Sequence, residues 1–215
     1  MRISLAWSFA GLVALPSTCA QLDSNTTTTT SQTSSATSFG CPNISPGPVS
    51  TYELAEQLPA SSVVDPYSIE AIRQTLALYA LALDGRNFEA LRKVFTTDVR
   101  ANYSDPIGVL DGVQAIIDTL PPGVTSFAST QHHYGSQYIH ICGRNTAVSV
   151  TYFQATHFFT PYAGVTNPVN NSQVLIDKAQ YQDLWARQGD GTWKITNRNL
   201  VRMGPPTLDG TFPTQ

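Results

Sequence analysis

Residues 68–103 are SIEAIRQTLALYALALDGRNFEALRKVFTTDVRANY, and this stretch decides the fold. Apolar side chains recur at helical spacing in its first half, which predicts a long amphipathic helix. Asp65-Pro66 is a typical helix start, and Gly85 is a typical stop. A short second helix and a strand are predicted after the turn. Asp84 ends the apolar face of the first helix, so its carboxylate is expected to point into whatever that helix covers.

Beyond Gly123 the apolar period changes from helical to two. Four strands are predicted in this half, over residues 126–141, 146–161, 173–187 and 192–202. Between Gly108 and Gly123 the sequence predicts a turn into a third helix that ends at Leu120-Pro121-Pro122-Gly123. Helices followed by antiparallel strands indicate an α+β fold, with the helices on one face of a strongly bent sheet.

The composition excludes several kinds of partner and cofactor. The chain has 215 residues, a net charge of −3 and 13% charged residues, without a basic cluster, so nucleic acid is not an expected partner. No phosphate-binding loop, Ser-His-Asp order or metal signature stands out, so no cofactor and no metal are expected. One alternative remains open, which is a metal ion held by Asp84, His132 and His133.

The N-terminus has the pattern of a signal peptide, with Arg2, a short apolar run and a small-residue cleavage site near Ala20. A membrane anchor is the alternative, but the run is short for a bilayer. We therefore expect a secreted or secretory-pathway protein that is free of the membrane after cleavage. The predicted divisions are a signal peptide (1–20), a disordered Ser/Thr-rich leader and strap (21–60), the main domain (61–204) and a tail (205–215).

Secretion changes how the cysteines and asparagines are interpreted. Cys41 and Cys142 are predicted to form a disulfide that pins the N-terminal tail to the domain, and two free thiols are the alternative. Four N-x-S/T sequons are candidate glycosylation sites, at Asn25, Asn43, Asn102 and Asn170.

An acid, two imidazoles and a phenol form a plausible acid–base set: Asp84, His132, His157 and Tyr103. The carboxylate would orient one imidazole, which would then move a proton between carbon and a leaving hydroxyl. Tyr103 would hydrogen-bond a carbonyl oxygen and stabilise the enolate. The structural alternatives are packed strand histidines and a solvated helix-cap carboxylate.

Strand geometry decides whether the histidines meet. His132 and His133 point to opposite faces of a regular strand, and the sequence leaves open which of them faces a cavity. If the strands on either side of Gly143 form a hairpin, a bulge near Gly135 would bring His132 close to His157.

Four strings in order resemble the SnoaL-like branch of the NTF2-like superfamily, and within it the scytalone dehydratase-like enzymes. They are ALDGRNFEALRKVFTTDVRANY (82–103), STQHHYG (129–135), TYFQATHFF (151–159) and YQDLWARQGDGTWKI (181–195). The resemblance covers residues 68–202. It implies a cone-shaped α+β barrel in which helices close a curved antiparallel sheet around one deep, mostly apolar pocket.

The resemblance also implies roles for single residues. Asp84 would orient His157, with His132 as the second pocket histidine and Tyr103 as one of two tyrosines that position a water or a carbonyl. Leu83 stands where the other tyrosine is expected, which argues against scytalone as the substrate. A small polar pair of the family is changed as well. The substrate-binding residues expected are Leu83, Phe153, Gln180, Gln182 and Trp185.

The function implied is a fungal, cofactor-independent lyase or cyclase of secondary-metabolite biosynthesis. It would dehydrate or cyclise a polyketide- or terpenoid-derived aromatic. One version of this function is a pericyclase that guides a hetero-Diels–Alder reaction of a quinone-methide-like intermediate. A secreted binding module for an apolar small molecule is the alternative, and Asp84 and His157 would then not touch. A third hypothesis is an interaction domain. We expect a homo-oligomer, a dimer.

Overall fold

The computed structural model describes residues 41–60, 65–160 and 173–210. Its elements are α1 (Thr51–Gln57), α2 (Pro66–Asp84), η1 (Phe88–Lys93), β1 (Phe95–Asn102), β2 (Val109–Asp111), α3 (Val113–Thr125), β3 (Ser129–Gly143), β4 (Thr146–Phe158), β5 (Gln173–Arg187), β6 (Trp193–Arg202) and β7 (Thr207–Gly210). The strands form one sheet in the order β2-β1-β6-β5-β4-β3, and β7 pairs with β5. Among these pairs only β1 and β6 run parallel. The α+β prediction is confirmed.

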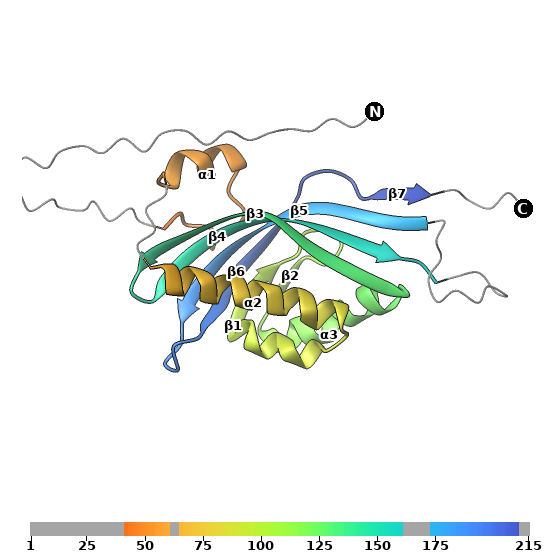
Figure 1. The fold of residues 1–215 in the computed structure, drawn as a ribbon, viewed down its shortest axis with the longest axis horizontal. Helices are drawn as coiled ribbons and strands as arrows, with labels where there is room; N and C mark the ends of the chain where they lie inside the picture. The colour runs from red at the N-terminus through yellow and green to blue at the C-terminus, as the bar shows by residue number, and fades with distance from the viewer. Residues whose placement is uncertain (1–40, 61–64, 161–172, 211–215) are drawn as a thin grey trace, which may run out of the picture. The chain divides into compact units, whose positions relative to one another are not determined.

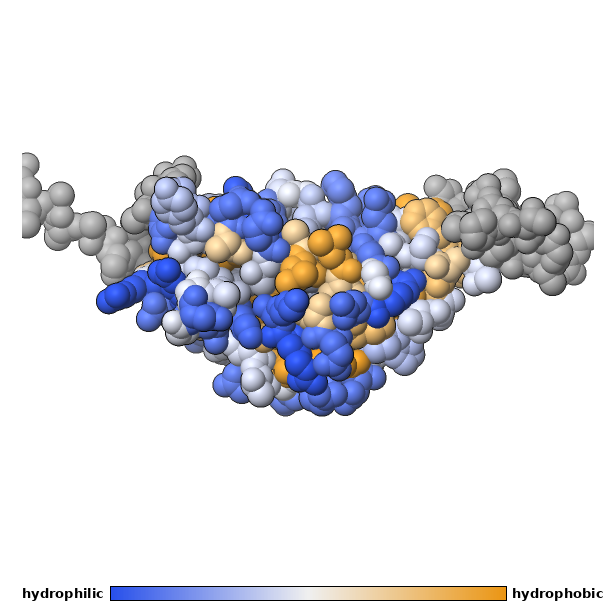
Figure 2. All heavy atoms as spheres, turned by 60° about the horizontal axis from the view of Figure 1, so that its bottom comes forward, coloured by the Kyte–Doolittle hydropathy of each residue, from blue (hydrophilic) through white to orange (hydrophobic). Residues whose placement is uncertain are grey.

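The sheet is curved (Figure 1). It is also open, because its path begins at β2 and ends at β3, which do not pair with each other. Helices α2 and α3 lie on one face, called here the inner face, and α1 lies on the outer face (Figure 1). The resemblance implied a barrel, whereas the sheet does not close on itself. The helix side of the molecule is mainly hydrophilic, with apolar side chains exposed near its middle (Figure 2).

Helix α2 forms as its sequence predicts. The Asp65 side chain caps it by accepting a hydrogen bond from the Ser68 N–H, and Pro66 is its first residue. Ile72 and Leu76 are completely buried against the sheet, and each such side chain contributes about 1.5–3 kcal/mol when it leaves water. Burial of one stripe therefore fixes the rotation of the helix about its axis, and with it the direction of Asp84.

The predicted short second helix forms as η1, which is a 3-10 helix. Two other local predictions were wrong. Helix α3 does not end at the segment from Leu120 to Gly123 but continues to Thr125, and its last turn buries Val124. Residues 207–210, predicted as tail, form β7 on the part of β5 that extends beyond β6.

Residues 41–60, called the strap, lie on the outer face. Cys41 and Cys142 form a disulfide with their Cα atoms 5.3 Å apart, as predicted. Ile44 and Leu54 of the strap are buried on β4. Amide side chains of β5 and β6 bind its backbone and one hydroxyl: Asn197 and Asn199 donate to the Ile44 carbonyl, Gln182 bonds both the N–H and the C=O of Val49, and Gln180 donates to the Thr51 hydroxyl.

The pairing of β3 with β4 contains the predicted bulge. Tyr134 pairs with Phe153 and Gln137 with Thr151, so β3 has one extra residue between these two pairs. On the near side of the bulge, His157 lies opposite Thr130. This register places the two strand histidines diagonally, as neighbours on one face.

Candidate active site

Asp84 is the last residue of α2, and the turn after it fixes its carboxylate. A Cβ on Gly85 would lie 2.8 Å from the Leu81 carbonyl oxygen, so this close approach requires glycine. Arg86 follows with a φ of 58°, in the left-handed region. The chain therefore leaves the helix sharply, and the Asp84 side chain points toward β3.

The Asp84 carboxylate binds β3 through three hydrogen bonds. Its Oδ2 accepts from the His132 backbone N–H at 2.8 Å, and its Oδ1 lies 2.7 Å from His132 Nδ1 and 2.8 Å from the Thr130 hydroxyl that donates to it. Partial burial raises the pKa of Asp84, but these hydrogen bonds and the charge of His132 outweigh burial, so the pKa is lowered. Asp84 is therefore an anion that holds the His132 ring.

Arg86 holds Thr130 in turn, which sequence reasoning missed. Its Nη1 donates to the Thr130 hydroxyl at 2.8 Å and to the Leu83 carbonyl at 3.2 Å. The Thr130 hydroxyl can then use its own hydrogen for Asp84. The order Arg86–Thr130–Asp84–His132 is a continuous chain of polar contacts. Its only sequence signal was that Arg86 directly follows the Asp-Gly turn.

His157 does not bind Asp84, so the predicted pairing was wrong. Its Nδ1 lies 3.3 Å from the Leu175 carbonyl of β5, and its ring centroid lies 6.4 Å from that of His132. The physical reason is strand order. The edge strand β3 lies beside the end of α2, whereas β4 is one strand further in. The carboxylate–imidazole contact that we expected in an enzyme is therefore made by Asp84 with His132 and not with His157.

The two imidazoles are in different electrostatic environments. Burial lowers the pKa of His157 below its ordinary value of 6.5, and the nearby His132 lowers it further. A ring nitrogen that bonds a carbonyl oxygen must carry hydrogen, so neutral His157 has its proton on Nδ1 and a lone pair on Nε2. His132 instead has a carboxylate at its Nδ1.

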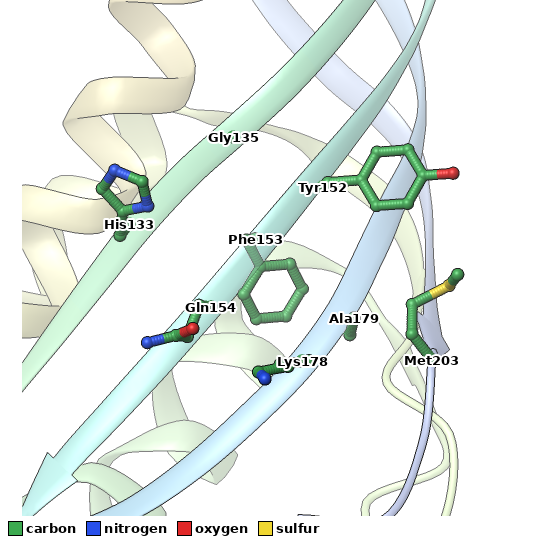
Figure 3. A pocket seen from close by; sticks show the side chains of 8 residues that line it. All are labelled: His133, Gly135, Tyr152, Phe153, Gln154, Lys178, Ala179 and Met203. Atoms are coloured by element: carbon green, nitrogen blue, oxygen red, sulfur yellow. The ribbon is translucent and has the colours of Figure 1, made fainter.

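His132 faces the inner side of the sheet and His133 the outer side. His132 lines the inner cavity described below, whereas His133 lines a shallow outer groove of about 300 Å³ with Tyr152, Lys178 and Met203 (Figure 3). Since the two histidines lie on opposite faces, they cannot bind one metal ion together with Asp84. Among the described residues, no group of three His, Cys, Asp or Glu is arranged to hold a metal ion.

Tyr103 is fully buried, and its hydroxyl lies 3.2 Å from that of Tyr79. Desolvation, together with the neighbouring phenol, raises the pKa of Tyr103 well above its ordinary value, so the group is a neutral donor. Tyr79 was not predicted. It lies one helical turn before Leu83, where the second tyrosine was expected, and so α2 does supply a second phenol.

These side chains line one cavity of about 270 Å³ between the inner face and the helices. Its walls are mainly apolar and aromatic, and include the predicted Leu83 and Phe153. The full lining is Tyr79, Leu83, Tyr103, Ile107, Leu120, Gly123, Phe127, His132, Phe153, Ala155, His157, Leu175, Asp177, Tyr181, Leu200, Arg202 and Pro206. Two of these residues, Asp177 and Arg202, form a charged pair at 2.6 Å that sequence reasoning missed.

Three predicted substrate-binding residues lie elsewhere. Gln180 and Gln182 face the outer side of the sheet and bind the strap, because even-numbered residues of β5 point away from the helices. Trp185 is on the inner face but is 2% exposed, with its indole N–H donating to the Ser149 hydroxyl. It belongs to the core and does not line the cavity.

A buried ion pair lies in the core next to the cavity. Arg198 and Asp183 are both completely buried, and two parallel hydrogen bonds of 2.7 and 2.8 Å join them. The guanidinium carbon lies 3.9 Å from the ring centroid of Tyr181 and 4.4 Å from that of Tyr79. Sequence analysis did not predict this pair.

The remaining predictions concern processing. Asn43 is exposed on the strap, while Asn102 is half-buried and its side-chain oxygen accepts a hydrogen bond from the Ser104 N–H. Asn25, Asn170 and the predicted signal peptide lie outside the described residues. Glycosylation therefore stays a prediction. None of the helices in the described ranges is both long and apolar enough to cross a membrane.

Comparison with known proteins relates this fold to a family. The chain resembles a candidate scytalone dehydratase from Novosphingobium aromaticivorans, with 26% identity and a TM-score of 0.54 over 67% of this chain and 88% of that one. It also resembles a candidate dehydratase of the NTF2-like family from Streptomyces avermitilis (12% identity, TM-score 0.57, 66% and 100% covered). A hexachlorocyclohexane dehydrochlorinase shares the fold (16% identity, TM-score 0.53, 68% and 90% covered).

No curated protein matches the sequence significantly. The model of the SnoaL-like domain matches residues 67–199, which is more than half of the chain and includes the whole acid–base set. The protein therefore belongs to the SnoaL-like domain family, and its fold is the one seen in NTF2-like proteins.

Proposed function

We propose that this protein is a cofactor-independent lyase that dehydrates an apolar, aromatic small molecule in the inner cavity. The observation that carries the proposal is the Asp84–His132 contact of 2.7 Å at an apolar cavity that also contains His157 and Tyr103. The similarity to a candidate scytalone dehydratase supports the reaction class. A cavity of about 270 Å³ suits a small fused-ring compound.

The different environments of the two histidines support different roles. His157, whose pKa is lowered, takes the proton from the carbon next to a carbonyl through its free Nε2. His132, whose Nδ1 lies 2.7 Å from the Asp84 carboxylate, gives a proton to the leaving hydroxyl. The C–H and C–O bonds break, a C=C bond and water form, and the proton on His157 returns to His132 through solvent.

Negative charge builds up on the carbonyl oxygen as the proton leaves carbon. Tyr103 donates a hydrogen bond to that oxygen in this proposal, with Tyr79 bonded to it from α2. A neutral, buried phenol suits this task, because a fixed donor in a dry site stabilises an oxyanion more strongly than water does.

The test compares matched histidine variants on a panel of fused-ring β-hydroxy ketones. Water loss is followed by mass spectrometry and by absorbance of the conjugated product. His132→Ala and His157→Ala are expected to lower kcat by about 10²–10⁴-fold. His133→Ala, one residue away on the outer face, is the control and should retain activity. Equal activity in all three variants would contradict the proposal.

A shape-driven cyclase is the second candidate, including a pericyclase of the hetero-Diels–Alder type. The stacked rings of Phe153 and Tyr181, with centroids 4.1 Å apart, support it, because they give the cavity a rigid aromatic wall. This candidate predicts that Ala155→Leu, which fills the cavity, lowers turnover more than His157→Ala does. The binding-module alternative predicts tight ligand binding without turnover.

We further propose that the protein works in the secretory pathway or outside the cell, in fungal secondary metabolism, on a polyketide- or terpenoid-derived compound. The disulfide Cys41–Cys142 supports an oxidising compartment. A producing strain that lacks the gene should recover the dehydrated or cyclised product with the wild type, and not with Asp84→Asn/His157→Ala. A homodimer also stays a prediction.

A further inference from the structure

The cation in the core, Arg198, is shielded from the cavity by two of its wall residues. Tyr79 and Tyr181 both line the cavity, whereas Arg198 does not and is completely buried. The guanidinium lies within 4.4 Å of both ring centroids, at distances typical of cation–π contacts. Tyr79 in turn lies 3.2 Å from the Tyr103 hydroxyl. A permanent charge is therefore one side chain away from the proposed oxygen-binding group.

Stability alone is a poor explanation for this ion pair. Taking both charges out of water costs several kcal/mol each, and apolar pairs of similar volume often stabilise a core equally well. The arginine also leaves one hydrogen-bonding group, Nη1, buried without a protein partner among the described residues. An arrangement that costs free energy in this way is better explained by what its charge does at the cavity.

The ion pair has its positive end, the Arg198 guanidinium, against the tyrosine rings of the cavity wall. Burial raises the pKa of Tyr103 most, and among the charged groups Arg198 lowers this pKa more than Asp183 raises it. The positive end of the pair therefore acts on the Tyr103 phenol more strongly than the negative end does. Asp183 fixes the guanidinium by two parallel hydrogen bonds, so the charge cannot turn away.

We propose that Arg198 is a positioning residue that holds the Tyr79 ring and polarises the Tyr79–Tyr103 hydroxyl pair, so that the cavity prefers an aromatic or enolic oxyanion to its neutral form. The inference rests on the proposed role of Tyr103 as oxygen-side donor. Arg198 does not touch the ligand. Its charge acts through the phenols, which become stronger hydrogen-bond donors when a cation lies against them.

The test uses 4-nitrophenol, which ionises visibly, and 4-nitroanisole, which has similar size and cannot ionise. Binding of both is measured across pH in the wild type and in Arg198→Met/Asp183→Leu. The double substitution avoids leaving one buried charge without its partner. We expect it to weaken phenolate binding about tenfold, which corresponds to one pKa unit of the bound phenol, and to leave nitroanisole binding unchanged. Arg198→Gln/Asp183→Asn is a second neutral pair that keeps hydrogen bonding and gives the same result.

Tyr103→Phe completes a mutant cycle. If Arg198 acts through the phenols, the double substitution should have little further effect in the Tyr103→Phe background. Additive effects, or an unchanged phenolate preference in folded neutral-pair variants, would overturn the inference. A phenolate preference that depends on Arg198 in a protein that dehydrates nothing would refute the proposed function and support this inference. Catalysis that depends on His132, without an effect of Arg198 on phenolate binding, would support the proposed function and refute this inference.

Discussion

Asp84 holds both the backbone and the ring of His132: Oδ2 accepts from the peptide N–H and Oδ1 meets Nδ1 of the same residue. A single carboxylate thus fixes the position of the strand relative to the helix end and also the rotation of the imidazole. Only the ring at this position has both constraints, since His157 is held by one carbonyl contact.

Replacing Asp84 by Asn should therefore impair catalysis and stability together. The Asn nitrogen would face a donor at one of the two positions, either the His132 N–H or Nδ1–H. We expect a loss of about 1–3 kcal/mol in the free energy of unfolding, as for other buried donors left without an acceptor, and a fall in kcat of about 10²-fold or more. Denaturant melts and dehydration kinetics measure the two effects. A variant with normal kcat would exclude Asp84 from catalysis.

The pH dependence should report His157. Its folded pKa is lowered mainly by burial, so the neutral, proton-accepting form persists below pH 6.5. The acidic limb of kcat/KM is expected to have its midpoint below 6.5, with activity lost as the pH falls through that value. Phe127→Ala, which removes the ring 4.6 Å from His157, should expose the imidazole and move the midpoint upward. A midpoint above 6.5 in the wild type would argue against His157 as the base.

Tyr79→Phe isolates the hydroxyl that sequence analysis overlooked. The ring and its contacts with Arg198 remain, and only the partner of the Tyr103 hydroxyl is lost. We expect kcat to fall about tenfold, the loss of one hydrogen bond in a network of this kind, with a melting temperature close to that of the wild type. Adding Leu83→Tyr to this variant tests whether a phenol one helical turn later can replace the Tyr79 hydroxyl. Undiminished turnover in Tyr79→Phe would leave Tyr103 acting alone.

Gly85→Ala tests whether the turn positions Asp84. The added Cβ would meet the Leu81 carbonyl at 2.8 Å, so the end of α2 must shift. We expect a destabilisation of about 1–3 kcal/mol and a loss of activity, because Asp84 moves with the turn. Gly189→Ala is the control, since nothing lies within 4 Å of its added Cβ. If both variants behave alike, the turn geometry is not what positions the carboxylate.

The sequence predicted helix α2 and the long strands well, because their signals are local. Asp65 and Pro66 start the helix, Gly85 ends it, and period two marks the strands. It also placed His132 and His157 in one cavity, and Asp84 lies behind His132 and binds it. It paired Asp84 with the wrong histidine because spacing along a chain does not tell which strand lies beside a helix end. Whether His132 or His133 faces inward depends on the bulge after Tyr134, and the position of this bulge is set by the pairing of β3 with β4.

The misplacement of Gln180 and Gln182 has a different cause. Both glutamines alternate with the inward-facing Ala179 and Tyr181, so they lie on the outer face, and they are buried there because the strap covers that face. The strand sequence does not show that the strap lies there. The buried pair Asp183–Arg198 was missed for a related reason. Charged residues in strands are usually exposed, and only the three-dimensional contacts show that these two neutralise each other.

The strap is synthesised before the surface that binds it. At a synthesis rate of about 5–20 residues per second, Cys142 follows Cys41 by roughly 5–20 s, since 101 positions separate them. The amides of β5 and β6 that bind the strap emerge later still. In an oxidising compartment the disulfide can therefore form first and keep the strap next to β3 while its binding surface is completed. The disulfide would then set the order in which the parts of the chain assemble during synthesis, in addition to stabilising the finished fold.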